Sequence, residues 1–255
     1  MNSVNKTLYI PLYGKAFVSS RGIILHDPRA EAIWAAEGFP LKGRSRSKWL
    51  AYYMGMRAAV FDRWLKAQME ADPAAVILHI GCGMDSRCAR VGTRGHLWFD
   101  MDFPEVIAER KRYYQEDAHY RMHCADVTDP ACLAGLPGGN AIVVMEGVSM
   151  YLSPEALKGV LDRIAAHFDS VSLLMDCYTT FAARASRYKN PINDVGVTEV
   201  YGMDDPNGLA GFLREHEMTP AELIGELDPM ERRIFKSLYA GAIAKKMYRL
   251  YEYRR

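Results

Sequence analysis

A turn that contains two glycines is the first feature of the sequence whose residue types fit a chemical role. The apolar stretch 74–80 leads into Gly81-Cys82-Gly83, and a polar segment follows. Glycines in such a turn let backbone amides approach a ligand closely at the start of a helix. Many glycine turns are purely structural, so the turn alone does not identify a ligand.

Acidic residues that follow two other strand-like stretches extend this set. Asp102 directly follows the stretch 95–101, about 20 residues beyond the glycines, and a carboxylate at this spacing can accept hydrogen bonds from ribose hydroxyls. Asp126 comes after the stretch 118–124, where it can accept from an adenine amino group or serve only as a turn residue. Together with the glycines, these positions favour a nucleoside ligand.

Two further charged residues occur in apolar surroundings. Glu146 ends the apolar stretch 140–146, at the edge where open α/β sheets bind ligands, and a charge there is costly without a partner. Arg57 falls within one face of a helix expected at about 46–70. That face is otherwise apolar and is formed by Leu50, Tyr53, Met54, Ala58, Phe61, Trp64 and Leu65. A buried arginine needs an anion, and the periodicity leaves open whether a protein carboxylate or a ligand carboxylate provides it.

The elements that must position these residues alternate along the chain. Five strand-like stretches are separated by helical patterns, which predicts a mostly parallel sheet. They are 74–80, 95–101, 118–124, 140–146 and 170–176. Ser153 and Pro154 give the N-cap and first-turn signals of a crossover helix between the last two stretches. Helices expected at 27–38 and about 46–70 precede the sheet and are predicted to cap it.

The C-terminal third of the sequence is less regular. Residues 178–205 are polar and rich in tyrosine and glycine, with a helix predicted near 180–188, and this composition suits a lid or a substrate loop. The final stretch 246–255 alternates with a period of two, which predicts a half-solvated edge strand.

Composition narrows the class of function. The 255 residues fit one large α/β domain, and 32 Lys and Arg against 31 Asp and Glu disfavour a nucleic-acid partner, because non-specific binding to phosphates needs a strong positive field. The chain begins without a signal-peptide pattern and has no apolar run near the ~20 residues of a membrane span. Its five cysteines form no CxxC pair. We therefore predict a cytoplasmic protein without a structural metal or a membrane partner.

Six segments together resemble the leucine carboxyl methyltransferase-like family, whose bacterial members include polyketide O-methyltransferases of the tetracenomycin type. They are IPLYGKA, LHDPRAEAI, VILHIGCGMDSRCARV, WFDMDFPEV, ADVTD and EGVSMYL, within residues 7–177. The resemblance implies a doubly wound α/β fold with a mostly parallel seven-stranded sheet of the class I methyltransferase type. We expect a single domain, 1–255. Its expected parts are an N-terminal helical cap (1–72), a cofactor-binding core (73–177), a lid or substrate loop (178–205) and the C-terminal part of the sheet (206–255).

The resemblance also implies S-adenosylmethionine (AdoMet) as the cofactor and assigns residues to its methionine portion. Lys15 and Arg57 match the residues that engage the methionine carboxylate. Gly81 and Gly83 match the glycines that approach the methionine portion, and Glu146 matches a glutamate beside the cofactor.

The remaining assignments concern the nucleoside and the methyl acceptor. The resemblance places Asp102 against the ribose and places Asp126 and Val127 against the adenine. Tyr151 matches a tyrosine that faces the acceptor pocket, and Tyr178 is a second candidate for orienting the acceptor.

Two residues depart from the pattern of the family. His79 stands where a small residue or asparagine is common, and we interpret it as a core histidine with satisfied hydrogen bonds rather than a residue that assists the methionine amine through water. Cys82 replaces the common alanine and is predicted to act as a small apolar residue in the turn.

The expected activity is AdoMet-dependent methylation of a carboxylate, hydroxyl or phenol of a small molecule such as a polyketide-like metabolite. A phenol with a pKa near ~10 gains from a general base, for which His26 is a candidate, whereas a carboxylate with a pKa near ~4 is already ionised. Two alternatives remain open. One is a nicotinamide-dependent oxidoreductase, which the glycine turn and Asp102 would serve equally, and the other is a nucleoside-binding regulator without catalytic activity.

Overall fold

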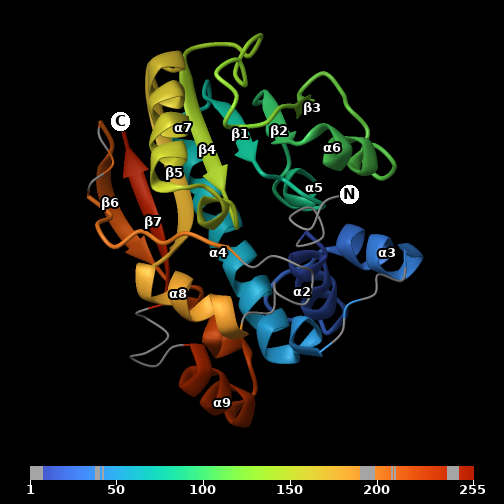
Figure 1. Cartoon of the computed structure of the whole chain (residues 1–255). Helices are drawn as coiled ribbons and strands as arrows, with labels where there is room; N and C mark the ends of the chain where they lie inside the picture. Colours follow the sequence, from blue (N-terminus) through green and yellow to red (C-terminus); the bar gives the residue numbers. More distant parts are fainter. Residues whose placement is uncertain are drawn as a thin grey trace.

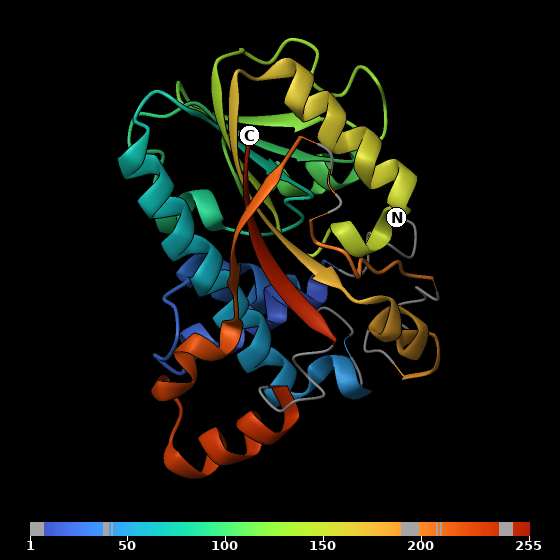
Figure 2. The same cartoon turned by 90° about the vertical axis from the view of Figure 1, so that its left-hand side faces the viewer.

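A seven-stranded sheet forms the centre of the molecule (Figures 1 and 2). The computed structural model describes residues 8–37, 41, 43–189, 199–207, 209, 211–239 and 247–255. The strands are β1 (Val76–Ile80), β2 (Trp98–Asp102), β3 (Tyr120–Cys124), β4 (Asn140–Met145), β5 (Ser170–Tyr178), β6 (Leu213–Met218) and β7 (Tyr248–Arg254). Their order is β3-β2-β1-β4-β5-β7-β6, and β7 runs antiparallel to both neighbours while the other six are parallel. The predicted fold class is confirmed.

Helices cover both faces of the sheet because successive side chains of each buried strand point to opposite faces. On β1, Ile77 belongs to one hydrophobic cluster and Leu78 to the other. Helix α4 (Lys48–Ala71) packs on the first face and helix α7 (Pro154–His167) on the second, as Figure 2 shows. The predicted N-cap of α7 is confirmed, since the hydroxyl of Ser153 accepts from the amide of the third residue after it.

Three helices are described in the N-terminal part, and two of them were predicted. These are α3 (Pro28–Glu37) and α4, whereas helix α2 (Tyr9–Ser20) carries little helical signal because its sequence includes proline, glycine and two serines. Packing against α4 holds α2 in place. The fit is close at Gly14, where an added Cβ would lie 2.5 Å from the Cβ of Met54. This packing buries Lys15, which is 2% exposed.

The C-terminal part of the sheet differs from its predicted form. Strand β7 is an interior strand, so the prediction of a half-solvated edge strand at 246–255 is wrong for its described residues. The edge is β6, whose residues are mostly exposed. The alternation of residues with a period of two suggested that one face of this strand is solvated. Glu252 on that strand is nevertheless buried, where it accepts a hydrogen bond from Gln68 and pairs with His216.

The remaining elements connect these parts. They are the 3₁₀ turns η1 (Gly43–Arg46), η2 (Ser149–Tyr151) and η4 (Pro220–Glu226) and the helices α5 (Arg87–Val91), α6 (Pro104–Arg110), α8 (Thr180–Lys189) and α9 (Pro229–Tyr239). Helix α8 confirms the helix predicted near 180–188, whereas α9 was not predicted. Residues 190–198 of the expected lid lie outside the described residues. Among the described helices, none combines the length and the hydropathy that crossing a bilayer requires.

The carboxyl ends of the parallel strands meet at one edge of the sheet. Strand β1 lies between β2 and β4. The chain adds β2 and β3 on one side of β1 and then crosses over to add β4 and β5 on its other side, so the strand order reverses at β1. Open α/β sheets bind ligands at such a reversal of strand order. Figure 1 shows the ends of these strands directed toward α2.

Candidate functional site

The glycine turn after β1 has a conformation that other residues would strain. Gly81 and Gly83 have positive φ angles of 64° and 49°. A Cβ on Gly81 would lie 2.3 Å from the side chain of Val148, so the turn also packs tightly against the segment after β4. Asp102 stabilises the turn, because its carboxylate accepts hydrogen bonds from the amides of Gly83 and Phe103, both at 2.8 Å. Burial raises the pKa of Asp102, although these two amides act in the opposite direction.

Asp126 lies in the neighbouring loop after β3. It is exposed, and one of its carboxylate oxygens accepts from the amide and the hydroxyl of Thr128 at 2.8 and 2.7 Å. These contacts are those of a turn residue. Val127 is half-buried, and its carbonyl accepts from Arg163 at 2.9 Å. The loop adjoins the ribose candidate, because the amide of Ala125 donates to the carbonyl of Asp102 at 3.0 Å.

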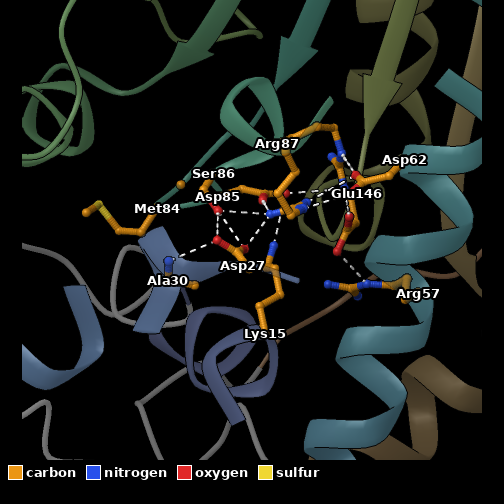
Figure 3. A network of polar contacts seen from close by, with 12 residues as sticks. Lys15, Asp27, Ala30, Arg57, Asp62, Met84, Asp85, Ser86, Arg87 and Glu146 are labelled. Atoms are coloured by element: carbon orange, nitrogen blue, oxygen red, sulfur yellow. Dashed lines mark hydrogen bonds and ion pairs between the residues drawn. The ribbon is translucent and has the colours of Figure 1, made fainter. Parts of the chain in front are cut away.

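Lys15 and three arginines pair with carboxylates beneath this edge (Figure 3). The ammonium group of Lys15 lies 2.9 Å from Asp85. Arg87, which is completely buried, contacts Asp62 at 2.8 Å, Asp85 at 3.2 Å and also Glu146. Burial opposes ionisation of Asp85, but the surrounding cations, led by Arg87, hold its pKa well below the usual range.

Arg57 joins this group from the middle of α4. Its guanidinium donates to Glu146 at 2.9 Å, to Asp176 at 3.1 Å and to the hydroxyl of Tyr248 at 2.8 Å. Burial favours the neutral form of Glu146, but Arg57 and Arg87 outweigh it and lower the pKa of this carboxyl to about 2. The anions beside Arg57 in the structure are the carboxylates of Glu146 and Asp176.

Asp176, at the end of β5, is in a different electrostatic position. It is fully buried and accepts from the amide of Gly147 at 2.7 Å as well as from Arg57. Gly147 has a φ of 73°, and a Cβ there would lie 3.5 Å from the guanidinium of Arg57. Burial raises the pKa of Asp176 to about 6, with Arg57 opposing and Glu146 reinforcing this effect.

Arg90 completes the group, which we call the ion-pair network. It contacts Asp27 at 2.6 Å, Asp62 at 2.7 Å and Asp85 at 2.8 Å. Within the described ranges the network has nine side chains, none of which is more than 10% exposed. They are Lys15, Asp27, Arg57, Asp62, Asp85, Arg87, Arg90, Glu146 and Asp176.

His79 is the core histidine that was predicted. Its Nδ1 lies 3.0 Å from Asp100 and its Nε2 lies 3.1 Å from Arg87. Because an arginine can only donate, Nε2 accepts and Nδ1 carries the hydrogen, so the ring is neutral in this arrangement. Cys82 is buried, and burial raises its pKa well above the usual value, which favours the thiol and agrees with its predicted packing role.

The two tyrosines proposed for the acceptor pocket pack, together with Tyr248, against one small hydrophobic cluster. Tyr151 and Tyr178 are half-buried and pack around a small cluster of Met150, Ala183 and Val200. The Tyr178 ring lies 5.5 Å from that of Tyr248, which was not predicted as a site residue.

Comparison with known proteins identifies the family. Residues 3–165 match the model of the family described as leucine carboxyl methyltransferase. A relative from Streptomyces glaucescens, the tetracenomycin polyketide synthesis O-methyltransferase TcmP, is 28% identical over 205 residues, which cover 77% of this chain and 76% of TcmP. The chain belongs to the leucine carboxyl methyltransferase family.

Other similarities agree with this membership. The S-adenosyl-L-methionine-dependent methyltransferase dpfgK of Gibberella zeae is 30% identical over 241 residues, covering 82% of this chain and 78% of dpfgK. Among solved structures, magnesium protoporphyrin IX methyltransferase of Synechocystis, with bound S-adenosylhomocysteine (AdoHcy), superposes with a TM-score of 0.53 at 15% identity and covers 89% of this chain and 93% of that one. A putative S-adenosylmethionine-dependent methyltransferase of Listeria monocytogenes gives 0.54 at 13% identity, with 79% and 99% covered. These two structures support the fold.

As a member of the leucine carboxyl methyltransferase family, the protein is an AdoMet-dependent methyltransferase. Its cofactor is therefore AdoMet, and the alternative of a nicotinamide-dependent oxidoreductase is set aside. His26, the candidate base, is exposed and lines a shallow surface hollow with Leu25 and Glu226. It is not among the residues of the ion-pair network.

Several residues of this candidate site were missed by sequence reasoning. They are Asp27, Asp62, Asp85, Arg87, Arg90, Asp176 and Tyr248. Signals for some of them exist in the sequence. Asp62 falls in the same amphipathic helix as Arg57, and Asp176 ends an apolar strand as Glu146 does.

Proposed function

We propose that the protein transfers a methyl group from AdoMet to a carboxylate or hydroxyl of a small aromatic molecule. The observation that carries this proposal is the hydrogen bond of 2.8 Å between Arg57 and Tyr248. It joins the ion-pair network to a group of tyrosine rings, since Tyr248 contacts the rings of Tyr53 and Tyr178, each at 5.5 Å. Aromatic rings pack favourably against other aromatic surfaces. The name of the relative TcmP, a polyketide O-methyltransferase, supports an acceptor of this kind.

The residues present fit the cofactor. The methionine portion of AdoMet has a carboxylate and an ammonium group, and the network offers the complementary charges in adjacent pairs, Lys15 with Asp85 and Arg57 with Glu146. When the zwitterion binds, its carboxylate takes the place of a protein carboxylate beside a cation, and its ammonium group takes the place of a protein cation beside a carboxylate. Each buried charge therefore keeps an opposite charge as its neighbour, which limits the cost of separating the protein pairs. We propose that Lys15 and Arg57 hold the methionine carboxylate and that Glu146 lies beside the ammonium group.

We further propose that the strand ends hold the rest of the cofactor. Gly81 and Gly83 give the methionine portion access to the backbone, and Asp102 accepts from the ribose hydroxyls while keeping its bonds to the turn. The second carboxylate oxygen of Asp126 is left for the adenine amino group, beside Val127.

The chemistry that AdoMet supplies when bound is an electrophilic methyl group on a sulfonium. The task of the protein is to align an acceptor oxygen with that group and to exclude water. In our proposal Tyr178, Tyr248 and Tyr151 orient the acceptor and shield it from solvent. A carboxylate acceptor requires no base at neutral pH, whereas a phenol gains from one.

The same proposal covers the organisation of the chain. Residues 1–72 cap the site, 73–177 bind the cofactor, 178–205 contribute to the acceptor side and 206–255 complete the sheet. The acceptor is a free small molecule rather than a nucleic acid. The five cysteines are all unpaired, which supports a reducing compartment such as the cytoplasm.

Calorimetric titration tests the cofactor and product analysis tests the acceptor. We expect AdoMet and AdoHcy to bind and NAD to show no heat. Incubation with AdoMet and a matched panel of aromatic carboxylates and phenols should yield a methyl ester or a methyl ether, identified by mass spectrometry. Methylation at nitrogen or carbon with no oxygen product would contradict the proposal.

Asp102 is the most direct test of the proposed cofactor residues. Asp102→Ala should weaken AdoMet and adenosine equally, by about 1–3 kcal/mol, the cost of leaving buried polar groups without their hydrogen-bond partner. Circular dichroism and thermal melting control for damage to the glycine turn. Unchanged affinity in a folded variant would remove Asp102 from the ribose site.

A further inference from the structure

The ion-pair network contains more negative than positive groups. Among the described residues, four cations face five carboxylates, so the fully ionised network has one net negative charge. Through His79 it adjoins Arg110, which pairs with Asp100, and this neutral pair leaves the excess unchanged. A buried excess charge is costly in the absence of a partner.

The excess is concentrated at Asp176. Glu146 is shared by two arginines, whereas Asp176 contacts only one of the network cations, Arg57, which it shares with Glu146. In the described part of the chain, the other groups facing Asp176 provide no second full positive charge. They are the amide of Gly147, which donates to its carboxylate, the hydroxyl of Ser149, which donates to its carbonyl, and the neighbouring Cys177 on the same strand. From β7, Tyr248 reaches the same guanidinium.

AdoMet and AdoHcy differ by the charge that would balance this excess. Both carry the methionine zwitterion, but AdoMet has in addition a sulfonium, and AdoHcy has a neutral thioether. We propose that Asp176 is the residue by which the site favours AdoMet over AdoHcy, because its carboxylate leaves the ion-pair network with an excess negative charge that the sulfonium neutralises. This inference rests on the proposed function, and it adds to that site a residue that distinguishes the cationic sulfonium of AdoMet from the neutral thioether of AdoHcy.

Protonation of Asp176 provides a second route to the same neutral state. Because burial raises the pKa of Asp176 to about 6, the apo protein is stabilised by the protonated form at low pH and loses that contribution as the pH rises through about 6. Binding of a cation favours the ionised form, so AdoMet should compete with the proton. AdoHcy, which brings no net charge, should not.

Calorimetry with three ligands tests this inference. Sinefungin, in which a carbon-bound ammonium group replaces the methylated sulfonium, separates the effect of charge from that of sulfur. For the wild type, the ratio of AdoMet to AdoHcy affinity should fall about tenfold between about pH 7 and pH 5, and sinefungin should follow AdoMet. For Asp176→Asn the ratio should be about tenfold lower at pH 7 and independent of pH.

Two variants serve as controls. Asp176→Glu keeps the charge and should retain the wild-type preference, whereas Asp162→Asn makes the same chemical change at an exposed position on α7 and should leave the ratio unchanged. If Asp176→Asn does not fold, the pH series on the wild type decides. An equal loss of AdoMet and AdoHcy affinity in Asp176→Asn, or a ratio that stays constant with pH in the wild type, would overturn the inference. Failure of all three ligands to bind the wild type would instead contradict the proposed cofactor site.

Discussion

The proposed cofactor side and the proposed acceptor side of the site are built from different kinds of contact. On the cofactor side, α2, α4 and the ends of β1 and β4 contribute charged groups that are buried and paired with one another. On the acceptor side, η2, β5 and β7 contribute half-buried tyrosines, and Phe181 on α8 is 61% exposed. Removing one ion from a buried pair leaves its partner uncompensated, whereas exchanging a partly exposed ring leaves little behind. The comparison therefore indicates that cofactor recognition is tied to stability and acceptor recognition is free to vary.

Replacement of Arg87 should have the largest effect on stability. Arg87→Met leaves Asp62, Asp85 and Glu146 short of a cation in a buried place and should lower the free energy of unfolding by about 3–5 kcal/mol. Denaturant unfolding of the apo protein measures this loss. Arg63→Met is the matched control, because Arg63 pairs with Glu222 at the surface and its loss should cost at most about 1 kcal/mol. Similar losses in the two variants would contradict the contrast between buried and exposed pairs.

Replacement of Arg57 should have a smaller effect, because Glu146 keeps Arg87. Arg57→Met leaves Asp176 with only the amide of Gly147 and should cost about 1.5–3 kcal/mol, the worth of hydrogen bonds to charged groups. Adding Asp176→Asn removes the stranded carboxylate, so the double variant should recover part of the loss in unfolding experiments. AdoMet should be weakened more than adenosine, which lacks the methionine carboxylate. An equal loss for both ligands would remove Arg57 from the methionine site.

The parts of the cofactor side that could be predicted from the sequence are local. The glycine turn and Asp102 follow strands whose apolar runs are visible, and Arg57 stands out within an amphipathic pattern. The partners of Arg57 were not visible, because its contacts with Glu146 and Asp176 join residues 89 and 119 positions away. Lys15 was assigned only through the family resemblance, since α2 is stabilised by packing rather than by its own helical propensity.

The acceptor side was less predictable for the same physical reason. Tyr248 reaches Arg57 only because β7 inserts between β5 and β6, and the sequence indicated an edge strand there. The pairing of strands that are distant in sequence depends on the whole sheet rather than on the period of one segment. The resemblance also fades after residue 177, so it gave no help with α8, β7 or α9.

Phe181 provides the test with the smallest expected effect on the fold. Because this ring is 61% exposed, Phe181→Ser should change the free energy of unfolding by less than about 0.5 kcal/mol, and the affinity for AdoMet should stay the same. If α8 contributes to the acceptor side, the same variant should raise the KM of an aromatic acceptor while leaving kcat largely intact, since a lost packing contact weakens binding of the acceptor before and during reaction alike. Lys158→Ser on α7, also exposed, controls for a generic surface change and should leave both parameters unaltered. A loss of AdoMet affinity or of stability in Phe181→Ser comparable to that of Arg57→Met would show that the two sides are not separable.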